Sequence, residues 1–164
     1  MPKKAITESD VIDIDSYIKD RDSIKKKIKE HKNNRRVHVG PHATFYFESY
    51  DTMLYQVQEM LYIERGGREQ LQDELKAYNP LIPTGKSLVV TLMFEIDNPN
   101  VRKKFLNSIG GIEKNTFIQV GDQKIYSRAE DDTDRTNEEG KASSVHFLHF
   151  DFDEFQIKSF SNMN

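Results

Sequence analysis

Two histidines and a glutamate share one face of a predicted strand, and metal binding is the chemistry that these residue types suggest. Apolar and polar side chains alternate from Val37 to Glu48, so His38, His42 and Glu48 project on the polar face. On an ideal strand His38 and His42 lie ~13 Å apart, too far for one ion to bind both imidazoles at ~2.1 Å. A divalent metal site would therefore combine His42 and Glu48 with a residue from elsewhere, for which His146 is the candidate. The alternative is a solvated or hydrogen-bonded face.

Two carboxylates on the helix predicted for residues 51–64 could act as a general base. Glu64 continues the apolar stripe of this helix, so we expect it to be at least partly buried. A buried carboxylate needs a partner or has a raised pKa, and an ion pair with Arg68, one turn further on, is the structural alternative. Glu59 lies on a second stripe with Tyr55. The enzyme hypothesis is that Glu64 or Glu59 works with a nearby histidine as general acid or base.

The segment from Lys25 to Arg36 is strongly basic and raises the hypothesis of a nucleic-acid-binding helix. No aromatic residues are interleaved with these charges to stack on bases. The whole chain is slightly acidic, with 24 Lys and Arg against 27 Asp and Glu. A solvated helix face, with basic residues that complement the helix dipole, is therefore the favoured interpretation.

The composition predicts a single cytoplasmic domain that spans residues 1–164. The chain has no cysteine, which excludes thiol catalysis, disulfides and cysteine metal sites. The N-terminal residues MPKKAITESD lack the apolar run of a secretory signal, and no stretch approaches the ~20 apolar residues of a membrane span. Walker, G-x-G-x-x-G and G-x-S-x-G motifs are also absent.

The order of the predicted elements places these residues in an α+β fold. A charged helix after Asp15 is followed by the strand of residues 37–48, where Gly40-Pro41 is a point of interruption, and by the helix that Asp51 caps. The later elements are a helix at 68–78, a central strand at 88–96, a short helix from Pro99, a hairpin that turns at Gly121-Asp122, an exposed loop at 128–141, a strand at 142–152 and a helix at 154–160. We expect one mainly antiparallel sheet of about five strands with helices packed on one face.

Four stretches of the sequence resemble a known bacterial family. VGPHATFYFESYDTMLYQVQEMLYIE, ELKAYNPLIP, LVVTLMFEI and SSVHFLHFDF are similar to members of the family catalogued as domain of unknown function 3501, and they occur in the family's order. Members tend to be encoded near rubrerythrin-like and iron–sulfur proteins. The resemblance therefore implies a redox partner, such as a rubrerythrin-like protein, and a link to oxidative stress, as an association without a mechanism.

The resemblance also singles out polar positions of this chain, which are His42, Glu48, Asp51, Tyr55, Gln56, Gln58, Glu59, Glu64, Asn79 and His146. Members often continue into a Gly- and His-containing tail, which this sequence lacks. We predict a binding or accessory protein in which His42, Glu48, Tyr55, Glu59 and His146 line a polar cleft between the strand and the helix after it. The predicted ligand is a divalent metal ion or a small anionic molecule. A homodimer through an edge strand is compatible with this prediction.

Overall fold

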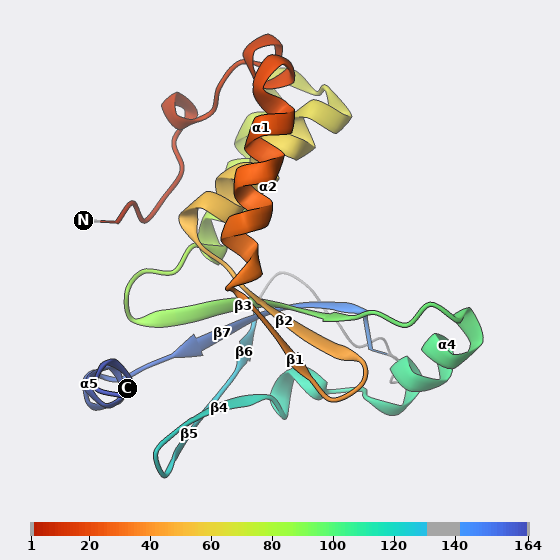
Figure 1. Cartoon of the computed structure of the whole chain (residues 1–164), viewed down its shortest axis with the longest axis vertical. Helices are drawn as coiled ribbons and strands as arrows, with labels where there is room; N and C mark the ends of the chain where they lie inside the picture. Colours follow the sequence, from red (N-terminus) through yellow and green to blue (C-terminus); the bar gives the residue numbers. More distant parts are fainter. Residues whose placement is uncertain (1, 131–141, 164) are drawn as a thin grey trace. The chain divides into compact units, whose positions relative to one another are not determined.

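The protein has the predicted α+β fold, with five α-helices and a five-stranded antiparallel sheet in the residues that the structure describes (Figure 1). This computed structural model describes residues 2–130 and 142–163. Contacts group the chain into two compact units: unit 1 comprises residues 1–35 and 48–84, and unit 2 comprises residues 36–47 and 85–164. One domain over residues 1–164 stays a prediction. Within the described residues, no helix is both long and apolar enough to cross a membrane.

Unit 1 is built from three helices, α1 (Ile14–Asn33), α2 (Tyr50–Glu64) and α3 (Gly67–Tyr78). Asp13 caps α1 by accepting a hydrogen bond from the backbone N–H of Ser16, and Ser49 caps α2 in the same way through Thr52. The predicted cap Asp51 instead lies in the first turn of α2, so this prediction is wrong by two residues.

Unit 2 contains the sheet, whose strands lie in the order β1 (Arg36–Val39), β2 (Ala43–Phe47), β3 (Ser87–Phe94), β7 (Val145–Asp151) and β6 (Arg128–Ala129). The central position predicted for β3 is confirmed, because β2 and β7 pair with its two sides. The predicted hairpin is also confirmed as β4 (Phe117–Val120) and β5 (Gln123–Tyr126). Of the loop predicted at 128–141, residues 131–141 lie outside the described part.

The single strand predicted for residues 37–48 is wrong, because the chain reverses there into the β1–β2 hairpin (Figure 1). Gly40 has a φ of +64°, which favours glycine, and Pro41 follows without a backbone donor. The reversal pairs His38 with Thr44, and the His38 Nδ1 lies 2.9 Å from the Thr44 hydroxyl. His42 consequently lies in the turn rather than on a strand face.

The core of unit 2 forms on one face of the sheet. Leu92 of β3 and Leu148 and Phe150 of β7 are almost completely buried there. Leu106, from α4 (Pro99–Ser108), packs into the same cluster. Asn98 caps α4 through two backbone N–H groups, and α5 (Glu154–Ser161) follows the last strand. Both helices occur where the sequence predicts them.

In unit 1, a single carboxylate joins α1 to α2. Glu59 of α2 accepts two hydrogen bonds from the Arg21 guanidinium, at 2.8 and 2.9 Å, and one from the Tyr17 hydroxyl. The Glu59 side chain is only 12% exposed, and the hydrogen bonds from Arg21 are the main reason that its pKa is lowered. Burial is the main cause that raises the pKa of Tyr17, and the hydrogen bond with Glu59 is the second cause. The phenol therefore stays protonated and donates to Glu59. Tyr62 adds an edge-on contact with Tyr17 and lies under the Arg21 guanidinium.

Two side-chain amides hold the N-terminal segment (residues 5–13) in unit 1. The Gln58 amide accepts from the backbone N–H of Ile12 at 3.1 Å and donates to the Ile12 carbonyl at 2.9 Å. Asn79 makes the same pair of bonds with Ile6, at 2.7 and 3.0 Å. Each amide therefore satisfies both backbone groups of one residue, as a neighbouring strand would.

We predict that Glu59→Gln lowers the free energy of unfolding at pH 7 by about 2 kcal/mol, because it removes the charge that accepts from Arg21 and Tyr17. A lowered pKa means that Glu59 stabilises the fold above its unfolded pKa of about 4.3, and that this stabilisation is lost as the pH falls through the folded pKa. Urea unfolding between pH 3 and 7 should therefore show a smaller pH dependence for the variant. Glu69→Gln, on the exposed surface of α3, is the control. Equal losses for both variants would contradict the prediction.

We predict that Asn79→Ala releases the N-terminal segment, because the buried Ile6 loses the partners of both its backbone groups. Stability should fall by about 1–3 kcal/mol. Amide hydrogen exchange of residues 5–12 should rise more than that of the sheet. Asn107→Ala makes the same change at an exposed position of α4 and should leave both measurements unchanged. Unaltered exchange at residues 5–12 in Asn79→Ala would refute this role.

Candidate functional site

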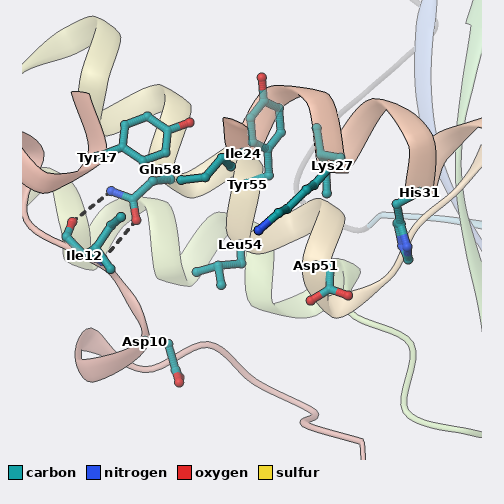
Figure 2. A pocket seen from close by; sticks show the side chains of 11 residues that line it. Asp10, Ile12, Tyr17, Ile24, Lys27, His31, Asp51, Leu54, Tyr55 and Gln58 are labelled. Carbon is teal, nitrogen blue, oxygen red and sulfur yellow. Dashed lines mark hydrogen bonds between the residues drawn. The ribbon is translucent and has the colours of Figure 1, made fainter. Parts of the chain in front are cut away.

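A groove of about 440 Å³ lies in unit 1 between the N-terminal segment, α1 and α2 (Figure 2). We call it the α1–α2 groove. Its walls are mostly apolar and consist of Ile12, Tyr17, Ile24, Ile28, Leu54 and Tyr55. This volume is within the range of about 300–1,000 Å³ that is typical of small-molecule sites.

Helical spacing explains why these side chains face the groove. On α1, Ile24, Ile28 and His31 follow one another at intervals of four and three residues, which places them on one stripe. On α2, Leu54 and Gln58 are four residues apart and form the facing wall. The N-terminal segment closes one side, where Gln58 fixes Ile12 (Figure 2).

Charged side chains gather at the other end of the groove, around Lys27, His31 and Asp51. His31 is tied to the start of α2, since its Nε2 lies 2.9 Å from the Ser49 hydroxyl oxygen. The Lys27 side chain extends across the groove in Figure 2. In the described part of the chain, neither Lys27 nor Asp51 has an ion-pair partner within 4 Å. The groove thus combines apolar walls with one ammonium group that is available to a ligand.

Asp10, which also lines the groove, is already engaged by its own segment. Its carboxylate accepts hydrogen bonds from the Lys3 ammonium and from the backbone and hydroxyl groups of Thr7. The Lys3 bond is the main reason that the pKa of Asp10 is held well below its usual range. Asp10 therefore remains ionised and contributes to the fold of the segment.

Of the site residues predicted from the sequence, Tyr55 is the one that lines this groove, and the Lys32 ammonium lies 5.5 Å from its ring centroid. Glu59 is on the same helix, but Arg21 and Tyr17 occupy its carboxylate. Glu48, just before α2, accepts a hydrogen bond from the Thr52 hydroxyl. These two carboxylates have local structural partners.

The expectation that Glu64 is partly buried is wrong. Glu64 is the last residue of α2 and is exposed, because Arg65 adopts a left-handed conformation that ends the helix there. Its carboxylate accepts from the Gln70 amide at 3.1 Å, and Arg68 pairs with Glu8 instead, at 3.8 Å. Glu64 therefore lacks the buried environment that the general-base hypothesis expects.

His42 and His146 both belong to unit 2 and pack against aromatic rings. The His42 ring meets Phe105 edge-on at 4.9 Å, and the fully buried His146 ring meets Phe94 at 5.9 Å. The ring centroids of Phe94 and Phe105 are 5.3 Å apart, so these two phenyl rings lie between the two histidines in a continuous series of ring contacts. His146 Nε2 also donates to the Ser143 carbonyl at 2.7 Å.

The predicted metal set of His42, Glu48 and His146 is not assembled within either unit, because Glu48 belongs to unit 1 and the histidines to unit 2. Across residues 2–130 and 142–163, no group of three or more His, Asp or Glu side chains is placed to hold a metal ion. The predicted cleft of His42, Glu48, Tyr55, Glu59 and His146 is likewise divided between the units.

Sequence reasoning missed Lys27 and His31 as site residues. The charge pattern predicts a solvated face for Lys27, whereas the family resemblance singles out Asp51 and Gln58, which both line the groove. The signal for His31 was present, since it continues the helical stripe of Ile24 and Ile28. The fact that α2 faces this stripe is a tertiary feature that the spacing does not give.

Comparisons with known proteins agree with this fold. Residues 5–164 match the family described as "Protein of unknown function (DUF3501)". A crystal structure of a novel protein of unknown function from Burkholderia pseudomallei superposes with a TM-score of 0.88 at 33% sequence identity, covering 96% of this chain and 82% of that one. No curated protein matches the chain. The chain belongs to the DUF3501 family, as its sequence motifs predict.

Proposed function

We propose that this protein binds a small amphipathic anion in the α1–α2 groove. The apolar body of the ligand would lie on Ile24, Leu54 and Tyr55, and its acidic head group would pair with the Lys27 ammonium. The observation that carries this proposal is an open apolar groove with one cationic side chain that has no ion-pair partner among the described residues.

The charge of α1 supports an anionic ligand. In its last nine residues, 25–33, α1 carries five lysines, at positions 25, 26, 27, 29 and 32, against the single acidic residue Glu30. A local excess of positive charge raises the local concentration of anions and steers them to the site. Asp51 opposes this less than its charge suggests, because it lies in the first turn of α2, where the helix dipole favours a carboxylate.

In this proposal the basic segment contributes to binding the small anion rather than nucleic acid. Lys27 is part of the groove, and Lys32 lies over the ring of Tyr55, which also lines it. We also propose that the protein is cytoplasmic, as its composition suggests, and that it works beside a redox partner such as a rubrerythrin-like protein, which only the family resemblance implies. Co-purification of such a partner with tagged protein from the native host tests that part separately.

We predict that Lys27→Glu weakens the binding of 8-anilinonaphthalene-1-sulfonate, an amphipathic anion that fluoresces in apolar sites, by about tenfold or ~1.4 kcal/mol. Lys26→Glu makes the same change of charge at the neighbouring exposed position, which does not line the groove, and should alter binding less than twofold. Fluorescence titration measures both dissociation constants. Equal losses for the two variants would show that the net charge matters and the groove does not.

We also predict that Leu54→Trp abolishes saturable binding of the same probe, because the larger side chain fills the groove between α1 and α2. Ile63→Trp is the matched control, since Ile63 is 64% exposed on the same helix and does not line the groove. Thermal melting should show that both variants fold. Unchanged binding by Leu54→Trp would place the probe elsewhere and refute the proposal.

A further inference from the structure

We propose a second, independent binding site in unit 2, which takes an uncharged hydrocarbon chain. A pocket of about 430 Å³ lies between the sheet and the segment that leads into β4. We call it the sheet pocket. It shares no lining residue with the α1–α2 groove and differs from it in chemistry.

The lining of the sheet pocket carries no charged side chain. Its two polar residues, Asn115 and Thr116, use their side-chain donors within their own turn: the Asn115 amide donates to the Gly111 carbonyl at 3.1 Å, and the Thr116 hydroxyl donates to the Ile112 carbonyl at 2.9 Å. A ligand with a charged or strongly polar body would lose its hydration here without compensation. An apolar ligand has no hydrogen bonds with water to give up when it enters this pocket.

The remaining walls are large and apolar, with five phenylalanines, namely Phe45, Phe47, Phe94, Phe117 and Phe150. At the mouth, Val37 and Val39 of β1 are 49% and 54% exposed, and Phe117 is 40% exposed. Exposed apolar residues that continue into an apolar pocket indicate a site for an apolar partner.

The extent of the sheet pocket across the strands favours a small molecule over a second copy of the chain. Its lining extends from the edge strand β1 to Phe150 of β7, which is three strand spacings or ~14 Å across the sheet. A partner strand paired with β1 would cover Val37 and Val39 at the mouth. It would leave the partly exposed Phe45 and Phe47 of β2 uncovered, whereas a flexible chain reaches them.

One cation lies near the mouth. The Lys124 ammonium is 4.5 Å from the ring centroid of Phe117, although Lys124 is not part of the lining. A neutral chain and its carboxylate counterpart therefore need to be compared. If the apolar walls decide binding, 1-decanol should bind at least as tightly as decanoate.

The experiment is a titration with Nile red, a neutral fluorescent probe, followed by displacement with 1-decanol and with decanoate. We expect saturable one-to-one binding that 1-decanol reverses. Ala43→Phe, which fills the pocket, should abolish it, and Val39→Asp, at the exposed mouth, should weaken it at least tenfold. Ala77→Phe, at an exposed position of α3, and Leu54→Trp, in the other groove, should leave it unchanged.

Three results would overturn the proposal. The first is the absence of saturable binding by the wild-type protein, and the second is unchanged binding by both Ala43→Phe and Val39→Asp. The third is a dimer in sedimentation velocity that Val39→Asp dissociates and that Nile red does not affect, which would make this face an interface between copies. Because Leu54→Trp separates the two sites, failure here leaves the anion proposal standing.

Discussion

The packing of α1 against α2 in unit 1 depends on the hydrogen bonds that the Glu59 carboxylate accepts. This carboxylate binds Arg21 and Tyr17 of α1 together, and its neighbour Gln58 binds the backbone of Ile12. Two consecutive residues of α2 therefore fix both α1 and the N-terminal segment. A second tie, between His31 and Ser49, lies near the start of α2. The α1–α2 groove is the space between these two polar ties, and its walls are mostly apolar.

Such a groove can stay open at little cost because hydrogen bonds join α1 to α2 at both of its ends. Directional hydrogen bonds set the distance between α1 and α2 at Glu59 and at His31, and Ile24, Ile28 and Leu54 between them have no polar group to satisfy. The free energy that remains to be gained is the burial of these apolar side chains, which a ligand can supply. The basic end of α1 then favours a ligand that carries a negative charge.

The sequence predicts the elements well wherever a local rule determines them. Apolar residues on both faces of residues 88–96 identify β3 as a central strand, and Gly121-Asp122 marks the turn of the β4–β5 hairpin. The prediction fails at Gly40, because alternating patterns on both sides of a turn look like one strand, and at Glu64, because a helical stripe does not show where packing ends. Tyr55 and Glu59 do lie on one stripe of α2. The contact of Glu59 with Tyr17 of α1 is set by tertiary packing, which no local sequence pattern predicts.

Two histidines in the described residues have partners that a general acid or base could use. The buried His149 pairs with Glu130, yet neither residue lines the α1–α2 groove or the sheet pocket. His31 and Ser49 are at the distance of a base and a nucleophile, but the Ser49 hydroxyl oxygen also accepts from the Thr52 N–H as the cap of α2, and Ser49 does not line the groove. General acid–base catalysis needs a proton-transferring group within hydrogen-bond reach of a bound substrate. In the described residues these two pairs instead use their polar atoms to hold secondary structure together.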